Sequence, residues 1–336
     1  MKIGIIGCGG VASAHIRALQ CIDAVSGIYG YDMDASRPEA LEKLFPRFQA
    51  MESFSDMITS VDGVIISTPN NTHLKVLKDI ISIKNIPVLS EKPLASSVED
   101  ANEFMKLAHS DSAINFNYRF NPVISLILKI KKDYELGELV FVDVAFNKNS
   151  ALSKKTLSWR DQENQNNSSG AFGDLGSHLF DLIHYLAGST INKNSLKISI
   201  GKRVKTRAGV DLTVDDNCIV TGMTVGETLF KMQASKSSPE EELGFHVYLI
   251  CQHGEIKYSS SNSGKIKVTY INQVRHDFVE VDLRKLIDDP SGEIPYWSDS
   301  FYFQNLAWTN TLRGRRSLEV ATIQDGCYIQ ELLSVI

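Results

Sequence analysis

The first 120 residues alternate short, almost uniformly apolar segments with helical patterns, and this alternation restricts the fold more than any other feature. Apolar strands are predicted at residues 3–6, 25–31, 61–67, 87–90 and 113–117. Helices are predicted between them at residues 11–22, 35–45, 73–83 and 98–109. Strands that are apolar on both faces and separated by helices are typical of a parallel sheet covered on both sides. The N-terminal region is therefore predicted to be an α/β domain with a doubly wound parallel sheet.

The pattern changes after Asn121-Pro122, and we place the hinge between two domains near residues 119–122. Apolar or alternating segments between Gly and Asn turns predict a strand at 139–146 and a large, mostly antiparallel sheet within 196–281. Helices are predicted at residues 123–134, 174–186, 298–312 and 323–335. We expect a first domain at residues 1–120 and an α+β domain with an open sheet at 121–336, whose last helices can pack back on the first domain.

The composition argues against several classes of protein. The formal net charge of the 336 residues is −5, so we expect no nucleic-acid partner. No apolar segment approaches the roughly 20 residues that span a bilayer, so we expect no membrane partner. The five cysteines form no Cys-x-x-Cys pair, which argues against a disulfide framework and against a zinc site. A reducing cytoplasm is therefore the expected location.

A glycine-rich turn, Gly7-x-Gly9-x-x-Ala12, closes the first predicted strand and opens the first predicted helix. In dinucleotide-binding folds the first glycine permits a tight turn, the second lets the backbone approach a pyrophosphate, and the third position must be small. The helix N-terminus then offers backbone N–H groups to the phosphates. The predicted cofactor contacts of this turn are Gly7, Gly9, Gly10, Val11 and Ala12.

Asp32 follows the second predicted strand, near the spacing at which an acidic residue binds the adenine ribose hydroxyls. A carboxylate at this position repels a 2′-phosphate, so NAD is the predicted cofactor in preference to NADP. The alternative interpretation is an ordinary turn acid in Asp32-Met33-Asp34.

Polar residues also follow the next two strands of the predicted sheet. Thr68 and Asn70 come after the strand at 61–67, and Glu91 and Lys92 come after the strand at 87–90. Ligands of an open α/β sheet bind outside the carboxyl ends of its strands, so these four residues are predicted to surround a nicotinamide ring. His73 is either a further cofactor contact or a residue of a first helical turn with no role.

Asp174, His178 and Asp181 have the spacing i, i+4, i+7, which places them on one face of the helix predicted at 174–186. An imidazole titrates near neutral pH, so His178 is a candidate for exchanging a proton with a substrate hydroxyl. A structural histidine and a metal site remain alternatives, although no further His or Cys clusters nearby, and we expect no metal. A serine hydrolase is disfavoured because the chain has no Gly-x-Ser-x-Gly elbow.

Taken in order, these motifs resemble the Gfo/Idh/MocA oxidoreductases, which include glucose–fructose oxidoreductase and inositol dehydrogenases. The resemblance also rests on Asn117-x-Arg119-Phe120, on Gly173-Asp174-x-Gly176-Ser177-His178-x-x-Asp181 and on features near the C-terminus, and it extends along nearly the whole chain. It implies a Rossmann domain that binds NAD and a second domain that binds substrate and forms a homodimer or homotetramer through its open sheet.

The resemblance also implies roles for single residues. Lys92 would contact the reacting oxygen, His178 would be the acid or base, and Asp174 would assist it. Asn117 would contact the cofactor, Arg119 the substrate, and Trp159-Arg160 resemble a substrate-side element of members that act on sugars. The Asn- and Ser-rich residues 162–169 look like a loop near the site.

The sequence therefore predicts hydride transfer between NAD(P) and a secondary hydroxyl or ketone of a sugar, a nucleotide sugar or a cyclic polyol. One alternative keeps the fold but uses NAD for transient oxidation in a glycosidase. Another is a non-catalytic NAD sensor or scaffold. The intact set of Lys92, Asp174 and His178 argues against the last.

Overall fold

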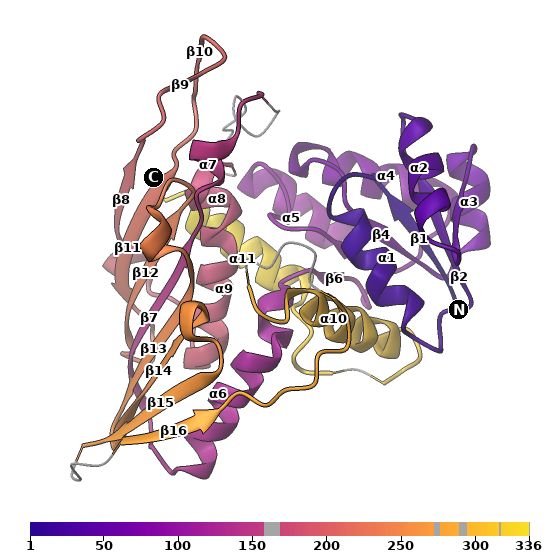
Figure 1. Ribbon diagram of the computed structural model, residues 1–336. Coiled ribbons are helices and arrows are strands. Elements are labelled where there is room, and N and C mark those ends of the chain that lie inside the picture. Colours follow the sequence, from indigo (N-terminus) through magenta and orange to yellow (C-terminus); the bar gives the residue numbers. More distant parts are fainter. Residues whose placement is uncertain (158–168, 272–275, 289–293, 316, 336) are drawn as a thin grey trace. The chain divides into compact units, whose positions relative to one another are not determined.

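The computed structural model describes residues 1–336 apart from 158–168, 272–275, 289–293, 316 and 336 (Figure 1). The chain forms two compact units. The first contains Met1–Asn121, Lys285–Asp288 and Ser298–Glu331, and the second contains Pro122–Arg284, Asp289–Trp297 and Leu332–Ile336. The last two helices, α10 (Trp297–Thr311) and α11 (Ile323–Leu333), therefore belong almost entirely to the first unit.

A six-stranded parallel sheet forms the centre of the first unit. Its strands are β1 (Lys2–Ile6), β2 (Gly27–Tyr31), β3 (Phe48–Ala50), β4 (Gly63–Ile66), β5 (Val88–Ser90) and β6 (Ala113–Ile114). They pair in the order β3-β2-β1-β4-β5-β6. The order reverses between β1 and β4, and this is the point where open α/β sheets bind their ligands. The predicted doubly wound parallel sheet is confirmed.

Helices connect these strands. They are α1 (Ala12–Gln20), α2 (Ser36–Leu44), α3 (Phe54–Ser60), α4 (His73–Ile83) and α5 (Val98–Leu107), with 3₁₀ turns η1 (Asn70–Thr72) and η2 (Asn117–Phe120). Ile16 and Leu19 of α1 are fully buried in a core that also contains Ile3 and Ile5 of β1. Trp308 of α10 belongs to the same core, and its indole N–H donates to the carbonyl of Asp111 at 3.2 Å.

Two elements of the first unit were missed by the sequence prediction, and one was too long. Strand β3 has three residues and α3 has seven, so neither is long enough to display a clear period. A capping signal was present, however, because the Ser53 side chain accepts a hydrogen bond from the Asp56 N–H at the start of α3. The strand predicted at 113–117 ends at Ile114, and η2 begins at Asn117.

The second unit is built on an eight-stranded sheet with the order β16-β15-β14-β13-β7-β12-β11-β8. The strands are β7 (Leu139–Asn147), β8 (Lys197–Gly201), β11 (Asn217–Met223), β12 (Leu229–Ser235), β13 (Gly244–Cys251), β14 (Gly254–Ser259), β15 (Lys265–Tyr270) and β16 (His276–Glu280). A separate hairpin pairs β9 (Thr206–Arg207) with β10 (Val210–Asp211). Only the pair of β7 and β12 is parallel among the pairs described, so the predicted mostly antiparallel sheet is confirmed.

Two helices, α8 (Gly170–Asp174) and α9 (Gly176–Ala187), pack on one face of this sheet (Figure 1). The unit also contains α6 (Pro122–Asp133), α7 (Ser150–Ser153), η5 (Lys193–Ser195), η6 (Glu240–Glu242) and η7 (Ser260–Asn262). Side chains alternate along β13, where Phe245, Val247 and Leu249 are buried and the intervening residues are partly exposed. The opposite face carries exposed apolar side chains such as Ile219 and Leu229.

The single helix predicted at 174–186 was wrong at its start. Asp174 is the last residue of α8, Leu175 joins the two helices, and α9 begins at Gly176. Asp174 and His178 therefore lie on two successive short helices rather than on one.

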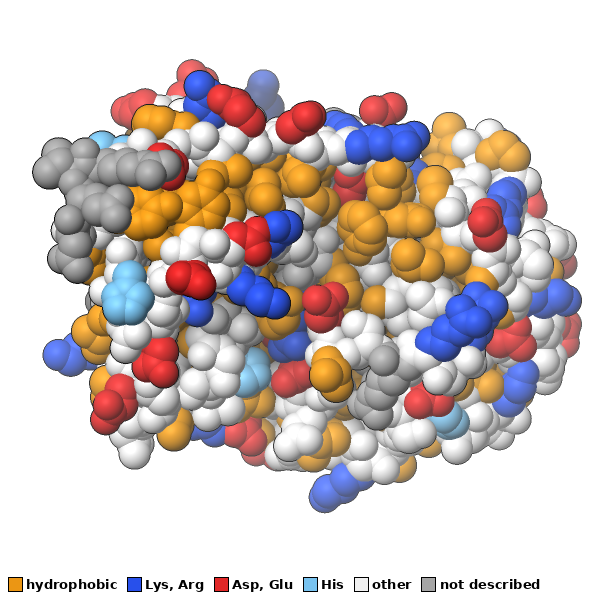
Figure 2. All heavy atoms as spheres, turned by 90° about the horizontal axis from the view of Figure 1, so that it is seen from below, with side chains coloured by type: hydrophobic (Ala, Val, Ile, Leu, Met, Phe, Trp, Pro, Cys, Tyr) orange, Lys and Arg blue, Asp and Glu red, His pale blue; other side chains and the backbone are white. Residues whose placement is uncertain are grey.

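No helix in the described ranges is long and apolar enough to cross a membrane. On the face seen in Figure 2, Lys and Arg side chains are interspersed with Asp and Glu side chains. This mixture is consistent with the small net charge of the chain.

Candidate active site

The turn after β1 is shaped by its glycines. Gly7 has a φ of +90°, and a Cβ atom there would lie 2.8 Å from backbone atoms of Ser67 and Thr68. Any residue with a side chain is therefore disfavoured at position 7 for two reasons. The backbone is left-handed there, and the Cβ atom would clash with the adjacent turn. A Cβ on Gly9 or Gly10 would meet no atom within 4 Å. The turn thus fits closely against the protein at Gly7 and leaves open space at Gly9 and Gly10, as a pyrophosphate cradle requires.

The loop is held in place by Asp32, which lies directly after β2. One carboxylate oxygen accepts a hydrogen bond from the Cys8 N–H at 2.8 Å, and the other accepts from the Asp34 N–H at 3.0 Å. The Arg37 guanidinium lies 3.6 Å from the same carboxylate but is more than half exposed. Each carboxylate oxygen keeps a second lone pair, so Asp32 can support the loop and also accept from a ribose hydroxyl.

The turn after β4 approaches the glycine turn through Ser67, whose hydroxyl donates to the Gly7 carbonyl at 2.6 Å. Thr68 and Thr72 are joined by a hydroxyl–hydroxyl hydrogen bond of 2.7 Å. Asn70 is buried, and its side-chain oxygen accepts from the Asn71 N–H. The structure therefore brings Thr68 and the glycine turn together at the carboxyl ends of β1 and β4, and the cofactor contacts predicted for Thr68 and Asn70 stay predictions.

His73 is buried at the start of α4 and joins two of these loops. Its Nε2 lies 2.9 Å from the Thr68 carbonyl oxygen, and its Nδ1 lies 3.1 Å from the Leu94 carbonyl oxygen. Burial lowers the pKa of His73, although both carbonyls and the charge of Glu91 act in the opposite direction. The ring therefore connects the loop after β4 with the loop after β5, and cofactor contact by His73 stays a prediction.

Glu91 is at the centre of a buried polar network beside Lys92. Its carboxylate lies 2.9 Å from His15 Nε2 and accepts from the Asn115 amide at 2.6 Å, and His15 Nδ1 lies 3.3 Å from the side-chain oxygen of Asn305. Burial raises the pKa of Glu91, but the hydrogen bond and charge of His15, together with Lys92 and Asn115, lower it more, so it lies below its ordinary value. The carboxylate thus ties α1 to the turn that carries Lys92.

Asn117 and Arg119 are buried in η2, at the end of the first unit's sheet. The Asn117 amide donates to the Ser300 hydroxyl at 2.8 Å, and the Arg119 guanidinium lies 3.6 Å from the Asp325 carboxylate. Both side chains therefore connect η2 to the C-terminal helices. Their predicted contacts with cofactor and substrate stay predictions.

The second unit presents Asp174, His178 and Asp181 on α8 and α9. His178 is nearly buried and Asp181 is fully buried. The Asp174 carboxylate forms a 2.8 Å ion pair with the ammonium of Lys236, which follows β12. This pair could not be predicted from the sequence, because the two residues are distant in the chain and no motif contains Lys236.

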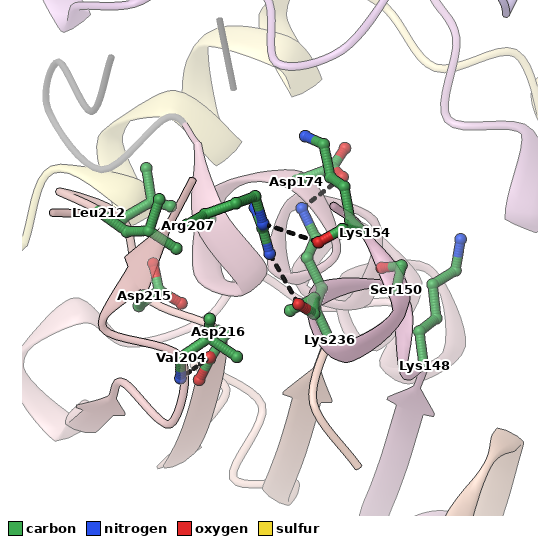
Figure 3. Close-up of a pocket in the computed structure, with 13 residues that line it drawn as sticks. Lys148, Ser150, Lys154, Asp174, Val204, Arg207, Leu212, Asp215, Asp216 and Lys236 are labelled. Atoms are coloured by element: carbon green, nitrogen blue, oxygen red, sulfur yellow. Dashed lines mark hydrogen bonds and ion pairs between the residues drawn. The ribbon is translucent and has the colours of Figure 1, made fainter. Parts of the chain in front are cut away.

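A pocket of about 280 Å³ lies beside this pair (Figure 3). We call it the Asp174 pocket. Its lining is Lys148, Ser150, Ala151, Lys154, Gly170, Asp174, Val204, Arg207, Leu212, Val214, Asp215, Asp216 and Lys236. All of these residues belong to the second unit. The pocket is therefore a candidate for substrate contact beside the predicted catalytic carboxylate.

Other predictions have a different outcome. Trp159 and Arg160, predicted to contact substrate, lie outside the described residues. Residues 162–168 of the predicted loop also lie outside them. Within the described residues, no group of three or more His, Cys, Asp or Glu side chains could hold a metal ion. His15 was missed, because a single histidine on the apolar face of α1 carries no pattern that points to Glu91.

Comparison with known families identifies the class of protein. Residues 1–118 match the model described as "Oxidoreductase family, NAD-binding Rossmann fold", and residues 131–336 match "Oxidoreductase family, C-terminal alpha/beta domain". The chain belongs to the Gfo/Idh/MocA oxidoreductase family. The predicted family and the predicted NAD(P)-dependent dehydrogenase activity are thereby confirmed.

Individual relatives give a more detailed picture. Glucose-6-phosphate 3-dehydrogenase from Bacillus subtilis is 31% identical over 99% of this chain and 95% of its own length. Inositol 2-dehydrogenase from an Arthrobacter species is 25% identical over 61% of this chain and 59% of its own length. The structure of levoglucosan dehydrogenase in complex with NADH and levoglucosan has a TM-score of 0.85 and 18% identity, and the match covers 100% of this chain and 96% of that one. At that identity, the structural match supports the fold alone.

Proposed function

We propose that this protein oxidises a secondary hydroxyl of a phosphorylated hexose and transfers the hydride to NAD, or catalyses the reverse ketone reduction. The full-length similarity to glucose-6-phosphate 3-dehydrogenase carries the proposal, because the inositol dehydrogenase match covers only about three fifths of the chain. The presence of Lys92, Asp174 and His178 together in this chain supports catalysis.

The first unit would hold the cofactor. Gly9, Gly10 and the N-terminus of α1 fit the pyrophosphate, and Asp32 fits the adenine ribose. When bound, NAD supplies the hydride acceptor. We propose NAD rather than NADP because the Asp32 carboxylate would repel a 2′-phosphate, and because Arg37, which could offset that repulsion, is more than half exposed.

Proton transfer would fall to side chains. His178 removes the proton of the substrate hydroxyl, and the Lys92 ammonium stabilises the negative charge that develops on that oxygen. Asp174 assists His178, and its ion pair with Lys236 holds the carboxylate in place. The Glu91 network keeps the turn that carries Lys92 attached to α1.

The second unit would bind substrate and form a homodimer or homotetramer through the exposed face of its sheet, on which Ile219 and Leu229 are about half exposed. Light scattering on the purified protein would give the number of subunits, and a monomer at working concentration would contradict this assignment.

All five cysteines are free, which suits a reducing compartment such as the cytoplasm. Fractionation of the source cells tests that location.

The activity is tested with glucose 6-phosphate, glucose, inositols and UDP-sugars, each with NAD and with NADP, by the absorbance of the reduced cofactor. We expect the highest kcat/KM with glucose 6-phosphate and NAD, with one NADH released per sugar oxidised. A glycosidase would release no net NADH. If no sugar is oxidised and no corresponding ketone is reduced with either cofactor, the proposal is wrong.

Two substitutions assign the chemistry. His178→Ala and Lys92→Ala should each reduce turnover at least about 100-fold while NAD binding survives, since general acid–base and electrostatic groups contribute on this scale. His184→Ala is the matched control, because His184 lies on the same helix and bonds to the Ser189 carbonyl. Near-normal turnover of both test variants would contradict the assigned roles.

A further inference from the structure

The Asp174 pocket contains more positive than negative charge. Lys148, Lys154, Arg207 and Lys236 contribute four cations, and Asp174, Asp215 and Asp216 contribute three carboxylates. In Figure 3 the ammonium of Lys236 lies against the carboxylate of Asp174, and Arg207 reaches the backbone of residues 151–154. Such a surplus, inside a hollow rather than on an open surface, favours an anionic ligand.

The three carboxylates of the pocket already form hydrogen bonds or an ion pair with other groups of the protein. Asp216 accepts hydrogen bonds from the Arg203 and Val204 N–H groups at 2.8 and 2.7 Å. Asp215 accepts from the Phe172 N–H at 2.9 Å, and burial raises the pKa of Asp215. Asp174 is paired with Lys236. An incoming anion therefore meets carboxylates that already accept hydrogen bonds or an ion pair from the protein.

Hydrogen bonds hold the backbone around Lys148 and Lys154 in place. Arg207, itself buried, donates to the Ala151 carbonyl at 2.7 Å and to the Lys154 carbonyl at 3.0 Å. The Ala151 N–H donates to the Lys236 carbonyl at 2.7 Å. The Lys148 N–H donates to the Ser235 carbonyl at 2.8 Å. Helix α7 is thus held between β9 and the end of β12, and these bonds fix the backbone from which the Lys148 and Lys154 side chains extend.

The size of the pocket restricts the ligand. Its 280 Å³ lies just below the roughly 300–1,000 Å³ of pockets that enclose a whole drug-sized ligand, so it suits a charged group and the part of a molecule that carries it. We propose that the Asp174 pocket binds the phosphate group of a phosphorylated sugar, with Lys148 and Lys154 as its main charged contacts. This inference rests on the proposed function and assigns the residues that select the phosphorylated substrate.

Two variants test the subsite, Lys148→Met and Lys154→Met, which keep most of each side chain's length and remove its charge. The control is Lys155→Met, because Lys155 is exposed, adjacent to Lys154 and outside the pocket lining. The ratio of kcat/KM for glucose 6-phosphate to that for glucose should fall about tenfold or more in each test variant, through KM. Inorganic phosphate should compete with glucose 6-phosphate in the wild type and compete less in both variants.

A binding measurement separates this inference from the proposed function. Titration calorimetry with saturating NADH compares glucose 6-phosphate with glucose in the wild type, both variants and the control. Selective loss of glucose 6-phosphate binding in the two variants supports the subsite even if no turnover is found, in which case the proposed function alone fails. Equal binding of the two sugars by the wild type, or equal losses in Lys155→Met, overturns the subsite while leaving the dehydrogenase proposal standing.

Discussion

The glycine turn after β1 and the Asp174 pocket are stabilised in different ways. Backbone conformation and hydrogen bonds from backbone N–H groups shape the turn, where Gly7 has a positive φ and the Asp32 carboxylate accepts from the Cys8 N–H. Ion pairs and side-chain donors from distant segments shape the pocket, where Asp174 meets Lys236 and Arg207 meets the carbonyls of α7. The first arrangement depends on which residues lack a side chain, and the second depends on which residues carry a charge.

The largest effect should come from the turn itself. Gly7→Ala places a methyl group 2.8 Å from the backbone of Ser67 and Thr68 and forces alanine into a left-handed conformation. We expect a loss of about 1–3 kcal/mol in unfolding free energy, together with loss of NAD binding. Chemical denaturation and NADH fluorescence titration measure the two quantities.

Gly9→Ala is the matched control, because a methyl group there meets no protein atom within 4 Å. Stability should change by less than about 0.5 kcal/mol, whereas NAD affinity should fall about tenfold because the methyl group occupies the space of the pyrophosphate. If Gly9→Ala destabilises the protein as much as Gly7→Ala, the distinction between a packed and an open glycine is wrong.

This contrast explains what the sequence could predict. The parallel sheet follows from strands such as Ile3–Ile6 that are apolar on both faces, and the cradle follows from Gly7 and Gly9, because local spacing encodes both. The network of His15 with Glu91 and the pair of Asp174 with Lys236 join residues far apart in sequence, so no spacing reveals them. The break between α8 and α9 was also missed, because the apolar period continues across Leu175.

A smaller loss of stability is expected when the ion pair of the Asp174 pocket is broken. Lys236→Met leaves the Asp174 carboxylate, whose side chain is only 24% exposed, without its cation. We expect a loss of about 1–2 kcal/mol in unfolding free energy, between the values for exposed and buried pairs, and a lower kcat. Chemical denaturation and steady-state kinetics provide the measurements.

Lys231→Met is the control for that substitution. Lys231 lies on β12 and pairs with Asp143 at 3.1 Å, but its own side chain is 39% exposed. Its removal should cost under about 1 kcal/mol and leave kcat unchanged. If both lysine variants behave alike, the pair of Asp174 and Lys236 has no special part in holding the site.

His73 is an exception to the contrast between the glycine turn and the Asp174 pocket. Near the glycine turn, its side chain joins the loop after β4 to the loop after β5. Burial lowers the pKa of His73 below its ordinary value of 6.5, so the unfolded chain takes up a proton at a higher pH than the folded chain. Stability should therefore fall as the pH drops from 7.5 towards 5.5, by at most about 1.4 kcal/mol per pH unit from this group. His73→Gln should be less stable at pH 7.5 but should lose less stability across this range, as measured by denaturation at several pH values. His276→Gln, on the exposed β16 strand, should keep the wild-type slope. An unchanged slope in His73→Gln would show that the ring does not stay neutral on folding, and that the loops after β4 and β5 are held together without it.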